Sequence, residues 1–134
     1  MTAGYSTTPL IKKLGIKPNN KVLLVNEPVY YLDLLGEMPS GVTIGIDESS
    51  LDFIHLFIKE KDELLELLSQ LKEILSKNGM IWVSWPRKAS KVDADVSDAV
   101  VREAGLEIGL VDVKVCAVDE VWSGLKFMYR VKDR

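Results

Sequence analysis

The chain has 134 residues, a length that fits one domain with one hydrophobic core, residues 1–134. Hydrophobic residues make up 47% of it and charged residues 28%, values of a soluble globular protein that exclude a disordered or fibrous chain. Its net charge of −3 gives no overall attraction to nucleic acid or anionic lipid, so we expect neither as a partner.

The first third of the chain is predicted to contain two short helices and two strands. The helices are residues 10–14 and 28–35, and the strands are residues 22–25 (VLLV) and 42–46 (VTIGI). Gly36 is placed to end the second helix, because glycine readily adopts the left-handed conformation common after a helix. The turn-forming sequence MPSG then leads into the second strand.

The middle of the chain is predicted to contain a strand, the longest helix and another strand. Residues 52–58 (DFIHLFI) are almost continuously apolar, which indicates a strand buried on both faces. The helix that follows carries an apolar stripe at helical spacing, formed by Leu64, Leu67, Leu68, Leu71, Ile74 and Leu75. We expect Asn78 and Gly79 to end this helix and residues 80–85 (MIWVSW) to form the next strand.

The last third is predicted to contain a helix and a hairpin. Asp95 is a good N-cap for a helix that runs through Ala104 with Gly105 as its terminator, or that continues to Ile108. Two strands, residues 111–118 and 125–131, flank the sequence DEVWSG and most simply form an antiparallel hairpin.

This alternation of strands and helices predicts an α/β fold. A parallel sheet with helices on both faces is the usual result of such an order, so we expect a three-layer sandwich. The sheet should be mostly parallel, have about six strands and end in the antiparallel hairpin.

The architecture resembles a shortened Rossmann-type methyltransferase domain. The likeness lies in the order of elements, the closing hairpin, and the passage LDFIHLFIKEKDELLELLSQLKEILSKNGMIWVSWP, which is similar to the central strand, long helix and next strand of that fold. The resemblance implies a Rossmann-like sheet that binds its ligands at the carboxyl ends of the strands.

Three sequence motifs resemble those of a family of small bacterial proteins catalogued as a domain of unknown function. They are GYSTTPLIKKLGIK, VSWPRKAS and GLVDVKVCAVDEVWSGLKF, and they extend from Gly4 to Phe127. This resemblance implies one compact cytoplasmic domain. It implies no activity and no site residue.

The turn after the first strand is the sequence Asn26-Glu27-Pro28, where nucleotide-binding versions of this fold have glycines. Glu27 brings a negative charge that can cap the helix and repel a phosphate or carboxylate, and Pro28 removes one backbone donor. Asp47 follows the second strand, where related folds place an acid on a ribose hydroxyl. A solvated turn is the simpler interpretation of Asp47, because the glycines are missing.

The basic loop after the fourth predicted strand is a second candidate site. Arg87 can hold a phosphate or carboxylate through two hydrogen bonds, Ser90 can add a third, and Lys88 adds charge. Trp85 lies beside these charges in the chain, and Trp122 lies in the hairpin sequence DEVWSG. The alternatives are a basic surface loop and a hairpin whose tryptophan covers the end of the sheet.

Two further residues are interpreted as structural. His55, the only histidine, lies within an apolar strand and is expected to be a core residue with one backbone partner. Cys116, the only cysteine, excludes an intrachain disulfide and is expected to be buried rather than reactive.

These observations favour a non-catalytic or regulatory domain that binds a small anionic ligand or a protein partner at the carboxyl ends of its strands. The binding residues would be Trp85, Arg87, Lys88, Ser90, Asn26, Asp47 and Trp122. The alternative is a divergent methyltransferase-like enzyme that uses S-adenosylmethionine, with Asp47 on the ribose and the Asn26 turn near the amino acid part. The sequence names no cofactor and leaves open whether the chain is an enzyme. No apolar run approaches the roughly 18 residues of a membrane helix and no export pattern is present, so we expect a cytoplasmic protein.

Overall fold

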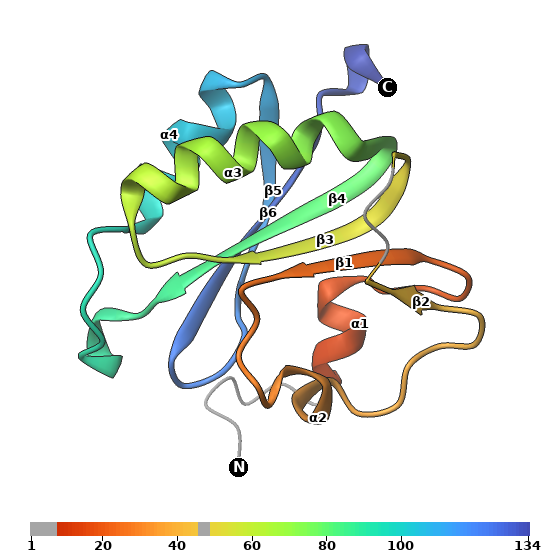
Figure 1. Cartoon of the computed structure of the whole chain (residues 1–134), viewed down its shortest axis with the longest axis horizontal. Coiled ribbons are helices and arrows are strands. Elements are labelled where there is room, and N and C mark those ends of the chain that lie inside the picture. The colour runs from red at the N-terminus through yellow and green to blue at the C-terminus, as the bar shows by residue number, and fades with distance from the viewer. Residues whose placement is uncertain (1–7, 46–48) are drawn as a thin grey trace.

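A computed structural model describes residues 8–45 and 49–134 of the chain. Within these residues six strands form one sheet in the order β2-β1-β3-β4-β6-β5 (Figure 1). The strands are β1 (Lys21–Val25), β2 (Thr43–Ile44), β3 (Leu51–Phe57), β4 (Leu75–Pro86), β5 (Leu110–Ala117) and β6 (Trp122–Tyr129). The helices are α1 (Leu10–Leu14), α2 (Tyr31–Leu35), α3 (Lys61–Ile74) and α4 (Asp98–Glu107), with short 3-10 turns η1 (Lys88–Ser90) and η2 (Val131–Asp133).

The sheet is mixed, with a parallel half and an antiparallel half. Strands β2, β1, β3 and β4 run parallel to one another, whereas β6 is antiparallel to both β4 and β5. The predicted α/β fold with a mostly parallel sheet and a closing hairpin is therefore confirmed.

Each face of the sheet has its own hydrophobic core, so the predicted three layers are present (Figure 1). On one face α3 and α4 cover the sheet, and the α3 stripe buries Leu64, Leu68 and Leu71. On the other face α1 and α2 bury residues such as Leu14 and Tyr31.

The predicted end of the long helix is wrong. Helix α3 ends at Ile74, and β4 begins at the next residue because Leu75 pairs with Leu51 of β3. Gly79 lies within β4, where a Cβ atom would stand 2.7 Å from the Leu51 carbonyl oxygen. Gly79 therefore allows two backbones to approach closely and does not stop a helix.

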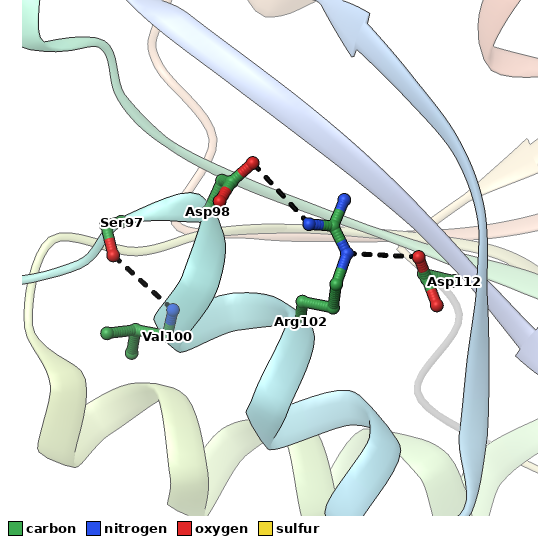
Figure 2. A network of polar contacts seen from close by, with 5 residues as sticks. All are labelled: Ser97, Asp98, Val100, Arg102 and Asp112. Carbon is green, nitrogen blue, oxygen red and sulfur yellow. Dashed lines mark hydrogen bonds and ion pairs between the residues drawn. The ribbon is translucent and has the colours of Figure 1, made fainter.

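Two predictions for α4 are also wrong, and a third is confirmed. Ser97, not Asp95, is the N-cap, and its Oγ accepts a hydrogen bond from the Val100 amide at 3.4 Å (Figure 2). Gly105 lies inside the helix, where a Cβ atom would stand 2.1 Å from the Phe127 ring. The helix continues to Glu107, as the longer alternative predicted.

Arg102 joins α4 to the edge strand β5. Its guanidinium lies 3.6 Å from the Asp98 carboxylate one helical turn earlier, and its Nε donates to Asp112 of β5 at 3.1 Å (Figure 2). All three side chains are partly exposed, so these ion pairs orient α4 more than they stabilise the fold.

The hairpin of β5 and β6 is confirmed, with different strand limits. Strand β6 begins at Trp122, three residues earlier than predicted, since the Val118 amide donates to the Trp122 carbonyl oxygen at 2.9 Å. The short turn that results places Asp119 beside the end of β4. Within the described residues, no helix combines the length and apolar character needed to cross a bilayer.

Candidate functional site

The carboxyl ends of β1, β3 and β4 lie at one edge of the sheet, where open α/β folds bind their ligands. The loops that follow these strands start at Asn26, Ile58 and Arg87. The turn between β5 and β6 joins the same edge, because Trp122 pairs with Pro86 at the end of β4. We call this region the carboxyl edge.

The turn after β1 is closed by its own contacts. Asn26 adopts a left-handed conformation with φ of 59°, and its Nδ2 donates to Glu63 Oε1 of α3 at 2.9 Å. The predicted capping by Glu27 is wrong, since α2 begins only at Tyr31 and has no side-chain cap. The segment before it is a turn in which the Tyr31 amide donates to the Pro28 carbonyl oxygen at 3.0 Å.

Asp119 organises the middle of the carboxyl edge. Its Oδ2 accepts a hydrogen bond from the Tyr30 hydroxyl at 2.8 Å, and its Oδ1 accepts from the Val121 and Trp122 amides, each at 2.8 Å. Its carbonyl oxygen accepts from the Arg87 guanidinium at 3.5 Å. Asp119 therefore connects the loop before α2, the loop after β4 and the hairpin turn.

Tyr30 keeps its proton in this arrangement. Partial burial raises the pKa of its hydroxyl first, and the hydrogen bond to the Asp119 carboxylate and the charge of that group raise the pKa further. The hydroxyl is consequently a donor to Asp119 at neutral pH, and the ring is held in one position.

The basic loop folds partly onto itself. The Ser90 hydroxyl donates to the Arg87 carbonyl oxygen at 2.6 Å and accepts from the Val92 amide at 3.3 Å. Lys88 is exposed, and Lys91 adopts a left-handed conformation with φ of 61°. Of the predicted anion-binding residues in this loop, Lys88 is exposed, whereas the Ser90 hydroxyl already has two hydrogen-bond partners within the loop.

The two tryptophans lie in different cores. Trp85 is 6% exposed and packs in the core beneath α3 and α4. Trp122 is 7% exposed and packs edge to face against Phe57 in the other core, with ring centroids 5.0 Å apart. Both are core residues, and the structure does not bring their rings together beside Arg87. Their contribution to ligand binding stays a prediction.

Asp47 lies outside the described residues, so its predicted contact with a ribose stays a prediction. Among the described residues, no three histidine, cysteine or carboxylate side chains gather in a way that could hold a metal ion.

His55 is a core residue, as predicted, but its partners are side chains rather than backbone. Its Nδ1 lies 2.7 Å from the Tyr31 hydroxyl and its Nε2 lies 2.8 Å from the Ser84 hydroxyl, and all three residues are fully buried. Burial lowers the pKa of His55 to about 3 and raises the pKa of Tyr31, which the charge of Glu27 raises further. A serine, a histidine and a tyrosine in contact resemble a catalytic set, but no substrate reaches them in this core.

An apolar projection beside the carboxyl edge is the feature that sequence reasoning missed. Val29 is fully exposed, and Tyr30, Leu32 and Leu34 are more than one third exposed. The sequence did contain a signal: with Tyr31 and Leu35 one turn apart on the buried side, the apolar residues between them cannot share that side. We call Val29, Tyr30, Leu32 and Leu34 the apolar projection.

Comparison of the sequence with models of known families identifies the family of this chain. Residues 44–131 match the model of a family described as a protein of unknown function, DUF3052. The chain belongs to this family. A search of curated proteins finds no match.

Several solved structures similar to this DUF3052 chain are methyltransferases. A SAM dependent methyltransferase from Aquifex aeolicus is 16% identical, with a TM-score of 0.62 over 90% of this chain and 88% of that one. A ribosomal protein L11 methylase from Lactobacillus delbrueckii subsp. bulgaricus is 15% identical, with a TM-score of 0.59 over 90% and 75%. A TehB-like SAM-dependent methyltransferase from Corynebacterium glutamicum is 13% identical, with a TM-score of 0.57 over 96% and 91%. At these identities the likeness shows the Rossmann-like, methyltransferase-like fold alone.

Proposed function

We propose that this DUF3052 chain is a non-catalytic binding domain that recognises a protein partner at the carboxyl edge of its sheet. The observation that carries the proposal is the full exposure of Val29 at the tip of the apolar projection. Four apolar residues within one segment of six are each more than one third exposed, and exposed apolar surface of this kind is characteristic of interaction sites.

The apolar projection is held in place before any partner arrives. The Tyr30 hydroxyl is bound to Asp119, and α2 is fixed to the core by its buried residues Tyr31 and Leu35. A partner would therefore bury the projection without ordering it, which lowers the entropic cost of binding. Tyrosine is also among the residues that contribute most to protein interfaces.

The charge beside the apolar projection indicates the chemistry of the partner. Arg87 donates to the Asp119 carbonyl oxygen, and Tyr30 donates to the Asp119 carboxylate. Because both contact the same residue, the basic loop adjoins the projection. Lys88 and Lys91 in that loop are exposed. A partner segment with an apolar side chain flanked by acidic groups would complement this surface.

Two contacts favour a protein partner over a small anion at this edge. The Arg87 guanidinium is already directed to the Asp119 carbonyl oxygen, and both hydrogen-bonding functions of the Ser90 hydroxyl are in use. A small anion would have to compete with the contacts of Ser90, whereas a protein partner would use the exposed lysines and the projection as they stand.

A pair of valine variants tests the proposal. The tagged chain, Val29→Asp and Val131→Asp are used to isolate partners from cells that express the chain, and a photo-reactive residue at position 29 identifies what touches it. Val131 is 77% exposed in the C-terminal turn η2, so it is a matched control. We expect a partner that binds wild type and Val131→Asp, crosslinks at position 29 and is lost from Val29→Asp. A partner retained equally by all three chains would contradict the proposal.

The methyltransferase fold favours one second candidate, a divergent enzyme that uses S-adenosylmethionine. The turn after β1 fits this cofactor poorly, because it has no glycine, presents the Glu27 carboxylate and commits the Asn26 amide to Glu63. Thermal unfolding with S-adenosylmethionine and with its demethylated product distinguishes the candidates. A ligand at 100 times its dissociation constant adds about 2.7 kcal/mol to the free energy of unfolding. A clear rise of the midpoint with either compound would place this candidate first.

A further inference from the structure

Five lysines gather on the face of the molecule that α1 covers. They come from α1, the loop after it, β5 and β6, and we call them the lysine face: Lys12, Lys13, Lys17, Lys114 and Lys126. The segments meet directly, because the Lys114 ammonium donates to the Lys13 carbonyl oxygen at 3.0 Å.

Two of these lysines are direct cross-strand neighbours. Lys114 of β5 pairs with Lys126 of β6 in the antiparallel ladder, so their side chains lie on the same face of the sheet. Like charges in directly opposite positions destabilise a sheet. Lys126 also pairs with Trp82 on its other side, and Trp82 donates to the Leu14 carbonyl oxygen of α1, which places Lys126 beside that helix.

Ion pairs within the described residues do not neutralise the lysine face, although Glu37 shares a second hollow with Lys12 and Lys17. Among the described residues, none of the five lysines forms an ion pair. The ion pairs that do form there join Arg102 to Asp98 and Asp112. The pKa of Lys126 is lowered by burial first and then by the charges of Lys114 and Lys17. The charged groups that act on Lys126 are thus positive, and its ammonium is held at a cost to stability.

The lysine face borders a surface hollow of about 460 Å³. The hollow is lined by Thr8, Lys12, Lys13, Lys114, Val115, Cys116 and Ala117. This volume lies within the range of small-molecule sites, and three of the lining residues are lysines.

We propose that the lysine face binds a compact ligand with two or more linked phosphates. Ammonium groups act as point charges that suit the tetrahedral oxygens of phosphate, whereas planar carboxylates are better matched by the arginine fork, which this face lacks. Phosphates seated between Lys114 and Lys126 would turn their mutual repulsion into shared attraction.

The distribution of charge favours a small ligand over nucleic acid. The chain has 17 basic and 20 acidic residues, so gathering five lysines on this face leaves the remainder clearly acidic. An extended polyanion would run from the lysine face onto that acidic remainder and be repelled, because nucleic acid binding needs a continuous basic track. A compact polyphosphate would fit on the lysine face without extending over that acidic remainder.

Calorimetric titration with sodium pyrophosphate at low ionic strength tests the proposal, with thermal unfolding as a second measurement. Pyrophosphate should bind wild type and raise its midpoint, and Lys114→Gln and Lys126→Gln should each weaken binding by at least about tenfold. Lys59→Gln, which removes an exposed lysine in the loop after β3, is the control and should bind as wild type does. Without pyrophosphate, Lys126→Gln should unfold at the same or a higher temperature than wild type, because it relieves repulsion.

A replacement variant and two further ligands complete the test. If either strand variant fails to fold, a double variant Lys12→Gln and Lys17→Gln replaces it, since both side chains are exposed. Adenosine diphosphate is compared with pyrophosphate to distinguish a nucleotide from a free polyphosphate, and tighter binding of either supports the proposal. No binding of these compounds to wild type, equal binding to all variants, or tighter binding of a single-stranded oligonucleotide would overturn it.

Discussion

Acidification should destabilise the protein through one buried side chain, His55. In the folded chain, burial lowers the pKa of His55 to about 3, whereas an unfolded chain has the ordinary value of 6.5. Between these two values the unfolded chain binds a proton that the folded chain does not. The stability that the neutral imidazole provides is therefore fully present above about pH 6.5 and is lost as the pH falls toward 3.

The size of the effect follows from the difference in pKa. Each pH unit below 6.5 costs about 1.4 kcal/mol of unfolding free energy from this one group. At about pH 4.5 the loss amounts to roughly 2.7 kcal/mol, a large part of the 5–15 kcal/mol typical of a whole domain. The loss is specific because the chain has only one histidine.

Urea unfolding at a series of pH values between about 7 and 4.5 measures this loss, with His55→Gln as the matched control. Glutamine keeps hydrogen-bonding atoms beside the Tyr31 and Ser84 hydroxyls but carries no titratable group. Wild type should lose stability faster than the variant as the pH falls, by about 1.4 kcal/mol per unit. Parallel curves for the two proteins would show that folding leaves the pKa of His55 unchanged, and the reasoning would be refuted.

Two substitutions test the corrected roles of single residues. Gly105→Ala should cost about 1–3 kcal/mol of unfolding free energy, because the added methyl group meets the buried Phe127 ring, and an unchanged urea midpoint would contradict that packing. Asp95→Ala should cost about 1 kcal/mol of unfolding free energy, because the Asp95 carboxylate accepts a hydrogen bond of 2.7 Å from the Lys61 amide at the start of α3. Asp93 is exposed and serves as the control, so an equal loss of stability in Asp93→Ala would contradict this role.

The element types were predictable from the sequence because they depend on local pattern. The apolar run of β3 and the spaced leucines of α3 reflect burial on two faces and on one face, respectively. The ends of elements depended on partners far along the chain. Leu75 continued the helical stripe, yet its pairing with Leu51 draws it into β4. Asp95 had the right chemistry for a helix cap, yet the helix whose amide it binds is α3.

The position of the carboxyl edge was predictable from the sequence, but the orientation of its side chains was not. The carboxyl edge and its loops followed from the order of strands, whereas the contact of Asn26 with Glu63 of α3 did not follow from the missing glycines. The orientation of Trp85 and Trp122 did not, because a strand alternates its side chains between two faces and the sequence did not show that both faces are cores. The lysine face needed the register of β5 and β6, which no local pattern encodes.

The pairing of β4 with β3 restricts where the length of this chain can vary among its relatives. One residue inserted within α3 would turn the rest of the helix by about 100° about its axis, and one inserted between Met80 and Trp85 would shift β4 by one position; either change moves apolar side chains out of their core. The stretch between Leu75 and Met80 is different, because its pairing with β3 is already irregular and can absorb an extra residue. Insertions and deletions should therefore collect in the loops between β1 and β3 and between β4 and α4 and at residues 76–79, while α3 and residues 80–85 keep a constant number of residues.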